Sequence, residues 1–293
     1  MININTDIAR RLIAEQFPEW SNLSIYPVKE SGNDNRTFHL GEEMSIRLPS
    51  AECYVPQVEK ENQWLAYLAE KLLIPISVTV AKGKATEYYP WSWSIMKWIK
   101  GETVNSDRVK DLNKFAGQLA DFLTSLYSIE TAGAPPAGKH NFFRGASLSV
   151  YDNETRQTLE ILKDEFEETI ILEIWGRALS TKWTEKPVWV HGDMAVGNIL
   201  VDKLGNLCGV IDFGILGVGD PACDLVMFWT FFDKESGSIF KEAMLLDENT
   251  WSRARGWALW KALISYRDYK KTKAARQEKE IINNIINEFL SAK

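Results

Sequence analysis

The stretch VWVHGDMAVGNILVDKLGNLCGVIDFG at residues 188–214 decides the fold of this sequence. It contains three short, β-prone apolar runs, at 188–190, 199–201 and 207–211. A polar loop that begins at His191 and closes at Asn198 separates the first two runs, and the turn sequence DKLGN separates the last two. The stretch therefore predicts a compact β-rich island with its polar side chains gathered in the loops.

The turn in this island sets a register that brings two polar residues together. If the turn is centred on Gly205, Leu200 faces Val210 across an antiparallel pair. The same register places Asn198 opposite Asp212, and directly opposed residues have Cβ atoms about 4.5–5.5 Å apart. Amide and carboxylate oxygens would then stand side by side, and such hard oxygen ligands suit Mg²⁺.

A second carboxylate, Asp193, lies in the connecting loop, where we expect it to face the same opening. A carboxylate in that place can accept a hydroxyl proton and align the attacking oxygen. Taken singly, Asp193, Asn198 and Asp212 are typical turn or cap residues. Their joint pattern favours phosphoryl transfer over that structural explanation.

These motifs resemble those of a known family. His-Gly-Asp-x₄-Asn, with Ile-Asp-Phe-Gly fourteen residues after the Asn, is similar to the pattern of the aminoglycoside phosphotransferase and choline kinase-like family of small-molecule kinases. The sequence GDPACDL at 219–225 matches the usual continuation of that family. The layout of most of the chain fits the resemblance, but its specific motifs lie at 191–225.

The resemblance implies a role for each motif residue. Asp193 would be the catalytic base, and Asn198 and Asp212 would be the metal ligands. His191 would be structural, because it would hold the loop in place. Two residues of GDPACDL would brace the catalytic loop or border the acceptor site: Asp220 and Asp224.

The resemblance also implies a fold, which is α+β, bilobal and protein-kinase-like. Residues 1–100 would form a small β-rich nucleotide-binding lobe, and residues 101–293 would form a larger, mainly helical lobe for catalysis and acceptor binding. The hydrophobic periodicity agrees, since it predicts helices near 6–17 and 55–70 and strands between and after them. Beyond Gly101 it predicts mostly helices, at 107–128, 152–178 and 221–292.

The nucleotide loop and the hinge are expected in the N-terminal lobe. SGNDNRTF at 31–38 occupies the place of the family's nucleotide loop, and Gly32 and Asn33 would let the backbone approach phosphates. A polar hairpin loop without a ligand would look the same. Lys97 and Trp98 lie where the hinge between the lobes would present backbone groups to adenine.

One residue departs from the family pattern. The third strand should offer a lysine to the phosphates, but SIRL at 45–48 offers Arg47. Arginine can hold phosphate in a bidentate fork and is not a simple replacement for lysine. Glu61, in ENQWLAYL, would be the helix glutamate that pairs with it, although a solvated helix face would read similarly.

Composition excludes several other classes of protein. The chain has 293 residues and a formal charge of −6, with 34 Lys and Arg against 40 Asp and Glu, which disfavours nucleic-acid binding. Cys53, Cys208 and Cys223 form no CxxC pair, which disfavours disulfides and zinc and favours a reducing compartment. The N-terminus is not typical of a signal peptide, and no apolar run approaches the roughly 20 residues of a membrane span. We expect a cytoplasmic protein with no membrane association and no obligatory protein partner.

The acidic excess is concentrated in one segment. Residues 152–173 hold eight Asp and Glu against Arg156 and Lys163, a local charge of −6. In the resembled family, helices before the catalytic loop help to form the acceptor site, so this charge suits a cationic acceptor such as an aminoglycoside. The alternative is an amphipathic helix whose exposed face is acidic.

The sequence thus predicts an ATP- and Mg²⁺-dependent small-molecule kinase, with GTP as the alternative nucleotide. An aminoglycoside-like amino sugar is the first choice of acceptor, and choline, another amino alcohol, a sugar or a macrolide are the alternatives. Macrolide kinases rank lower because they tend to carry His at the position of Asn198. From another class, a weakly catalytic nucleotide-binding regulatory module is favoured by Arg47 and disfavoured by the complete set of motif residues.

Overall fold

The structure is a computed structural model that describes residues 3–29, 32, 34–163, 165–270 and 272–291. The chain divides into two compact units. The first contains Met1–Glu102, Leu200–Asp202 and Cys208–Gly214, and the second contains Thr103–Ile199, Lys203–Leu207 and Ile215–Lys293. Two short segments after residue 199 thus belong to the first unit. The assignment of nucleotide binding to residues 1–100, and of catalysis and acceptor binding to residues 101–293, stays a prediction.

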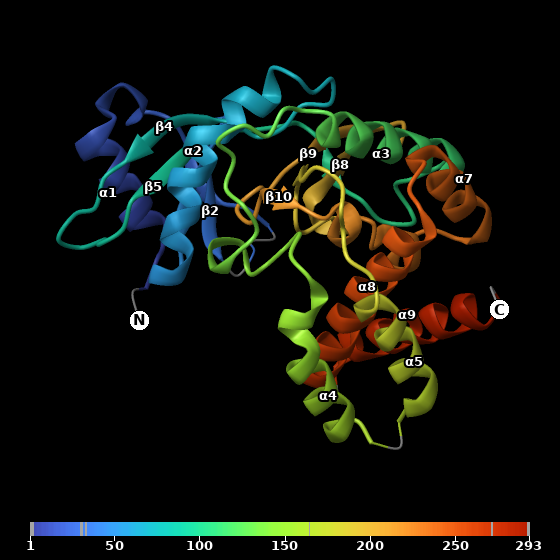
Figure 1. The fold of residues 1–293 in the computed structure, drawn as a ribbon. Helices are drawn as coiled ribbons and strands as arrows, with labels where there is room; N and C mark the ends of the chain where they lie inside the picture. The colour runs from blue at the N-terminus through green and yellow to red at the C-terminus, as the bar shows by residue number, and fades with distance from the viewer. Residues whose placement is uncertain (1–2, 30–31, 33, 164, 271, 292–293) are drawn as a thin grey trace. The chain divides into compact units, whose positions relative to one another are not determined.

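A five-stranded antiparallel sheet with strand order β1-β2-β3-β5-β4 forms the centre of the first unit (Figure 1). Its strands are β1 (Ile25–Pro27), β2 (Asn35–Leu40), β3 (Met44–Pro49), β4 (Thr79–Gly83) and β5 (Trp93–Lys97). Helix α1 (Thr6–Gln16) shares a core with one face, where Ile46 and Leu48 of β3 are buried. Because side chains alternate along a strand, Arg47 points to the opposite face, toward α2 (Val55–Ala69).

Local chemistry explains where these elements begin and end. Asn5 caps α1, since its side-chain oxygen accepts hydrogen bonds from the N–H groups of Asp7 and Ile8 at 3.1 Å. Pro75 has no N–H to donate to a strand ladder and Ile76 forms only an isolated bridge to Val210, so β4 begins at Thr79. Strand β4 lies at the edge of the sheet, next to β5.

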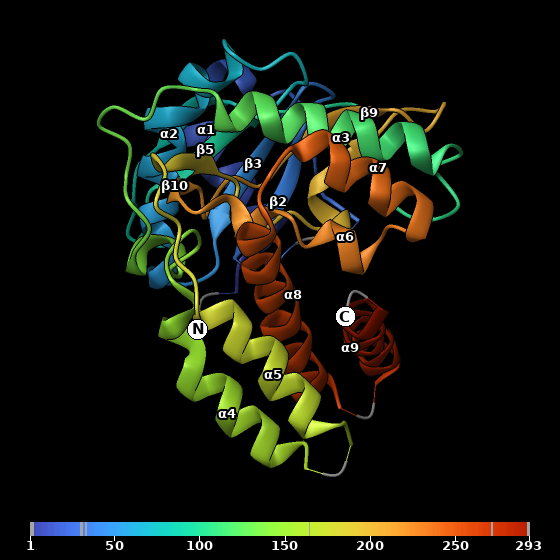
Figure 2. The ribbon, with the colours of Figure 1, turned by 45° about the vertical axis from the view of Figure 1, so that its right-hand side comes forward.

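The second unit is mainly helical. Its long helices are α3 (Leu112–Tyr127), α4 (Asp152–Ile161), α5 (Glu168–Leu179), α7 (Lys234–Met244), α8 (Glu248–Tyr269) and α9 (Lys273–Ser291), with the single turn α6 (Met227–Thr230). Helix α8 contacts α4, α5 and α9 on different sides, which Figure 2 shows. Because α8 is surrounded, buried residues cover most of its circumference, and they include the charged Arg253 and Arg255. Helix α3 packs on α7.

Short strands flank the motif residues. β7 (Val188–Val190) pairs antiparallel with β10 (Gly217–Gly219), and a small sheet has the order β6-β8-β9. Its strands are β6 (Glu102–Thr103), β8 (Ile199–Val201) and β9 (Leu207–Val210). Asn198 ends the 3-10 helix η5 (Val196–Asn198), and Asp212 follows β9 with a φ of 63°. Both residues therefore lie just outside the strands, and their facing one another stays a prediction.

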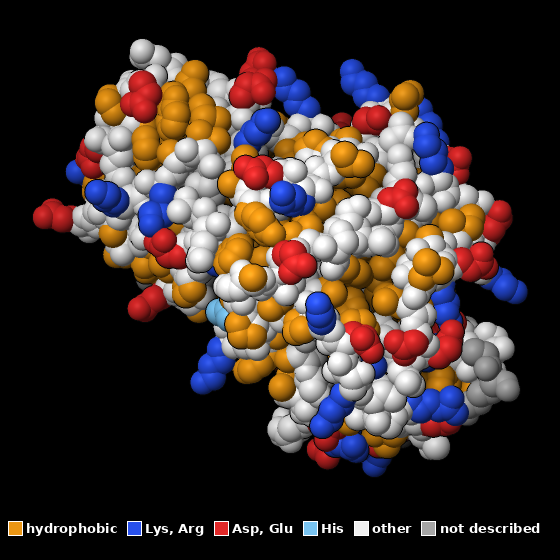
Figure 3. Space-filling model, turned by 45° about the horizontal axis from the view of Figure 1, so that its top comes forward, with side chains coloured by type: hydrophobic (Ala, Val, Ile, Leu, Met, Phe, Trp, Pro, Cys, Tyr) orange, Lys and Arg blue, Asp and Glu red, His pale blue; other side chains and the backbone are white. Residues whose placement is uncertain are grey.

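A nucleic-acid-binding surface requires basic area, and a membrane-spanning helix requires length and apolar character. Over the described residues of the face drawn in Figure 3, Lys and Arg side chains are interspersed with Asp and Glu, and no continuous basic area forms. None of the described helices combines the length and the apolar character needed to cross a membrane.

Two helical glycines allow the packing around α8 to be tested. A Cβ at Gly256 would lie 2.5 Å from the Cβ of Ala178 and 2.7 Å from Cδ1 of Leu148, whereas a Cβ at Gly117 of α3 would meet nothing within 4 Å. We expect Gly256→Ala to lower the free energy of unfolding by about 1–3 kcal/mol through overpacking. Gly117→Ala should raise it by about 0.5–1 kcal/mol, because alanine restricts the unfolded chain. Urea unfolding of both variants measures the difference, and equal effects would contradict the close packing of α5 on α8.

Candidate functional site

Arg47 joins three segments of the first unit. Its Nη1 lies 2.6 Å from Oε1 of Glu61 on α2, and its Nη2 lies 2.6 Å from Oδ1 of Asp212 after β9. The Glu61 side chain is only 3% exposed, whereas that of Asp212 is 41% exposed. The ion pair with Glu61 that the resemblance implies is therefore present, and the guanidinium also engages the predicted metal ligand Asp212.

Burial controls the charges in this cluster. Burial lowers the pKa of Arg47, but the two carboxylates outweigh that effect and raise it, so the guanidinium stays charged. Burial raises the pKa of Glu61, and the charge of Arg47 opposes the rise. Burial lowers the pKa of the neighbouring Lys60 to about 8. Both Nη atoms of Arg47 are used by carboxylates, so a phosphate must compete with these contacts for the fork.

The predicted nucleotide loop is described only in part. Gly32 is exposed, and its carbonyl oxygen accepts a hydrogen bond from Nη1 of Arg36 at 3.1 Å. Asn33, which the sequence also assigns to this loop, lies outside the described residues. Asp34 accepts a hydrogen bond from Nε2 of Gln57 at 2.9 Å, and burial raises its pKa. This contact is not predictable from the sequence, because a polar residue on α2 gives no signal of a partner in a distant loop.

The predicted hinge residues have their N–H groups engaged within the protein. The N–H of Lys97 donates to the carbonyl of Val78, and that of Trp98 donates to the carbonyl of Glu43, both at 2.8 Å. The Trp98 ring centroid lies 4.2 Å from that of His39. The assignment of Lys97 and Trp98 to a nucleotide stays a prediction, and these two N–H groups already have acceptors.

The HGD loop of the second unit is held by one carboxylate. Asp224, at the end of the 3-10 helix η6 (Pro221–Asp224), accepts hydrogen bonds from the N–H groups of His191 and Gly192, each at 2.7 Å. Gly192 has a φ of 86°, and a Cβ there would lie 2.9 Å from the carbonyl oxygen of Ile215. Only glycine fits this turn without strain. Burial raises the pKa of Asp224 to about 6, against the effects of His191 and the two N–H groups.

Asp193 is hydrogen-bonded to one residue that precedes it in the sequence and to one that follows it. Its N–H donates to Nδ1 of His191 at 3.1 Å. Nδ2 of Asn198 donates to its carbonyl oxygen at 2.9 Å and to its Oδ2 at 3.1 Å. Because the amide nitrogen of Asn198 faces Asp193, its oxygen is left as an acceptor. The loop thus presents a half-buried carboxylate with a fixed orientation, which suits a group that aligns a hydroxyl.

The donor set fits Mg²⁺ in its chemistry. Mg²⁺ takes few protein ligands, prefers carboxylate and amide oxygens, and keeps waters and substrate phosphates in its other positions. Asn198 and Asp212 offer such oxygens, and the ion pair of Asp212 with Arg47 uses only its Oδ1. Within the part of the chain that the structure describes, no three His, Cys, Asp or Glu side chains converge as a metal cage.

Asp220 forms a buried ion pair with α8. Its Oδ2 lies 2.6 Å from Nε of Arg253, and both side chains are almost fully buried. Its Oδ1 accepts a hydrogen bond from the N–H of Ala222 at 3.1 Å. Asp220 therefore anchors the GDPACDL segment to α8, while Asp224 holds the HGD loop.

The comparison with known proteins identifies the family. A family model described as the phosphotransferase enzyme family matches residues 27–257. The chain belongs to this phosphotransferase family. An aminoglycoside 3'-phosphotransferase of Acinetobacter baumannii is 23% identical over 222 residues, which make up 73% of this chain and 82% of that protein.

Solved structures share the fold of this phosphotransferase. The GDP complex of a mutant of aminoglycoside 2'-phosphotransferase-IIIa matches with a TM-score of 0.76 at 18% identity, covering 98% of this chain and 99% of that chain. The macrolide 2'-phosphotransferase MphH from Brachybacterium faecium matches with a TM-score of 0.61 at 18% identity, covering 95% and 97%. The predicted α+β, protein-kinase-like fold is confirmed, as is the prediction that the chain is a small-molecule kinase.

Three carboxylates in the acidic segment of the phosphotransferase are bonded inside the second unit. Asp152 accepts a hydrogen bond from the indole of Trp175 at 2.7 Å, and Glu154 accepts one from the indole of Trp260 at 2.9 Å. Glu165 pairs with Lys270 at 2.5 Å. These carboxylates connect α4 and the chain after it to α5 and α8. Their charge therefore supports a cationic acceptor less than the sequence suggests.

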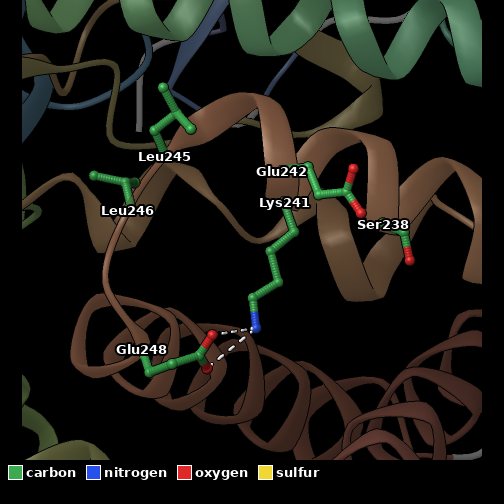
Figure 4. Close-up of a pocket in the computed structure, with 6 residues that line it drawn as sticks. All are labelled: Ser238, Lys241, Glu242, Leu245, Leu246 and Glu248. Atoms are coloured by element: carbon green, nitrogen blue, oxygen red, sulfur yellow. Dashed lines mark hydrogen bonds and ion pairs between the residues drawn. The ribbon is translucent and has the colours of Figure 1, made fainter.

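A surface depression of the phosphotransferase lies away from all of these groups in the sequence. It is lined by six residues near the end of α7 and the start of α8: Ser238, Lys241, Glu242, Leu245, Leu246 and Glu248 (Figure 4). Lys241 and Glu248 form an ion pair across it at 2.8 Å. None of the predicted site residues lines this depression.

The buried ion pair at Arg47 predicts a non-additive effect on stability. Arg47→Met leaves Glu61 buried without its partner, and we expect it to lower the free energy of unfolding by about 3 kcal/mol. Adding Glu61→Leu should recover most of that loss, because the second change removes the uncompensated charge. Chemical unfolding of both variants measures this, and a double variant at least as unstable as Arg47→Met would contradict the charge explanation.

The raised pKa of Asp224 predicts a pH dependence of stability. Its pKa rises from 3.8 to about 6, so between these values the folded state binds more protons than the unfolded state. This contribution is therefore present at low pH and is lost as the pH rises through 6. Relative to Asp224→Asn, the wild type should lose up to about 1.4 kcal/mol per pH unit between pH 4 and 6. Unfolding at a series of pH values checks this, and parallel curves for the two proteins would contradict it.

Proposed function

We propose that this phosphotransferase transfers the γ-phosphoryl group of ATP, with Mg²⁺, to a hydroxyl group of a small molecule. The observation that carries the proposal is the orientation of Asp193 by His191 and Asn198 in the HGD loop. A carboxylate fixed in this way can accept the proton of an acceptor hydroxyl and align its oxygen for attack. GTP is the alternative nucleotide, and the GDP complex of a protein with the same fold supports testing it.

Other residues take the roles that the family resemblance implies. Asn198 and Asp212 would bind Mg²⁺, which when bound neutralises charge on the phosphates. Arg47, positioned by Glu61, would hold the phosphates through its fork. Nucleotide contacts are further proposed for the loop and the hinge, at Gly32, Asn33, Lys97 and Trp98. His191, Asp220 and Asp224 would hold the catalytic loop.

An aminoglycoside-like amino sugar is the proposed acceptor. The relative from Acinetobacter baumannii is named as an aminoglycoside 3'-phosphotransferase, and exposed carboxylates of the acidic segment, such as Glu168, would favour a cation. A macrolide is supported by the likeness to MphH, and choline, another amino alcohol or a sugar fit the same chemistry. The free cysteines Cys53, Cys208 and Cys223 support action in the cytoplasm.

A regulatory nucleotide-binding module is the second candidate, and one contact favours it. Both Nη atoms of Arg47 donate hydrogen bonds, one to Glu61 and one to Asp212. If these contacts persisted with nucleotide bound, they would slow phosphoryl transfer. Such a module would show a nucleotide-dependent thermal shift without turnover on any acceptor.

The test is ADP or GDP release with Mg²⁺ and a panel that contains kanamycin, gentamicin, erythromycin, choline and a simple sugar. We expect turnover with an amino sugar. Asp193→Asn should lower kcat by about 10²–10⁴-fold and leave the KM for the nucleotide nearly unchanged, because the carboxylate acts on the acceptor.

Asp121→Asn, an exposed change on α3, is the matched control and should behave as the wild type. Full activity of Asp193→Asn on a true acceptor would overturn the assignment. A nucleotide-dependent thermal shift with no turnover across the panel would support the regulatory module instead.

A further inference from the structure

Arg144 binds the peptide group that carries Asp193. This arginine precedes α4 and is only 8% exposed, and its Nε donates a hydrogen bond to the carbonyl oxygen of Gly192 at 3.0 Å. The N–H of the same peptide group is that of Asp193, which donates to Nδ1 of His191. Both polar groups of the peptide before Asp193 are therefore fixed by buried side chains.

The guanidinium is itself held by several neighbours. Its Nη1 donates to the carbonyl oxygen of Phe142 at 3.3 Å and to the hydroxyl of Tyr151 at 3.0 Å. Its central carbon lies 4.8 Å from the ring centroid of Trp260 and 5.3 Å from that of Trp257. Cation–π contacts of this kind strengthen when water is excluded, so Arg144 has one preferred position.

The backbone around Arg144 is shaped to this contact. Phe142 and Phe143 have φ angles of 50° and 57°, which bulky residues seldom adopt. A Cβ at Gly192 would lie 3.0 Å and 3.1 Å from Cβ and Cγ of Arg144, so the arginine stem packs directly against the turn. The segment before Arg144 therefore keeps an unusual backbone conformation while the arginine side chain packs closely on the turn at Gly192.

We propose that Arg144 is a positioning residue that fixes the orientation of Asp193 through the carbonyl of Gly192. The inference rests on the proposed role of Asp193 as the base. Arg144 acts opposite Asp224, which holds the N–H of the same glycine. Lysine cannot replace it, because an ammonium lacks the planar fork that reaches Gly192, Phe142 and Tyr151 together.

Amide hydrogen exchange of the ligand-free protein tests the inference without any substrate. Loss of the contact should speed exchange of the amides at 191–198 by about tenfold in Arg144→Lys and Arg144→Met, as expected for one lost hydrogen bond. Tyr151→Phe keeps the arginine but removes one of its acceptors, so it should give a smaller change in the same amides. This milder variant keeps the test valid if Arg144→Met fails to fold.

The matched control is Arg255, which is equally buried and pairs with Glu288 of α9 at 2.7 Å. Arg255→Lys should leave exchange at 191–198 unchanged. If Arg144→Lys and Arg255→Lys gave the same exchange at 191–198, the inference would be wrong, whatever their effects on stability.

Kinetics separate this inference from the proposed function. Arg144→Lys should lower kcat at least tenfold with little change in the KM for the nucleotide, whereas a general loss of fold would change both. Retained activity in Asp193→Asn would overturn the role of Asp193. A Asp193→Asn variant without activity, together with normal kcat in Arg144→Lys, would overturn only the role of Arg144.

Discussion

The contact between the Asp224 carboxylate and two consecutive backbone N–H groups is the constraint on which the catalytic loop depends. A strand that ends at Val190 would normally continue or turn in several ways. Two charge-assisted hydrogen bonds, donated by the N–H groups of His191 and Gly192 to one buried carboxylate, select this turn and bring the N–H of Asp193 to the imidazole. The carboxylate is costly to bury, and the cost is offset because both of its oxygens are used. The position of Asp193 therefore follows from a residue thirty-one positions later in the chain.

In the first unit the arrangement is reversed, because the single guanidinium of Arg47 pairs with two carboxylates. A guanidinium can engage Glu61 and Asp212 through separate nitrogens, while an ammonium presents a single point of charge. The departure from the family's lysine thus changes what the central strand can hold. Because Glu61 is buried and Asp212 is partly exposed, the first contact is structural and the second can exchange with solvent or a ligand.

The motif residues were readable from sequence because their chemistry is local. HGD, Asn198 and IDFG lie within 191–214, and their spacing was sufficient to predict the family and the α+β fold. The ends of the strands were not predictable, because a turn alone does not set how far a strand runs, and Asn198 and Asp212 lie just beyond β8 and β9. Arg144 and Gln57 gave no signal, since each acts on a loop far away in the sequence. The charge of residues 152–173 was counted correctly, but sequence could not show that indole N–H groups donate to two of its carboxylates.

The bonds between carboxylates and indoles in α4, α5 and α8 have a consequence for how this enzyme can evolve. Asp152 and Glu154 link helices in addition to carrying charge, because each accepts a hydrogen bond from a tryptophan on another helix. Replacing either one with an apolar residue would leave a largely buried N–H without its acceptor. Charge in this segment can therefore change first at exposed positions such as Glu160 and Glu168, which can change sign without loosening the helices.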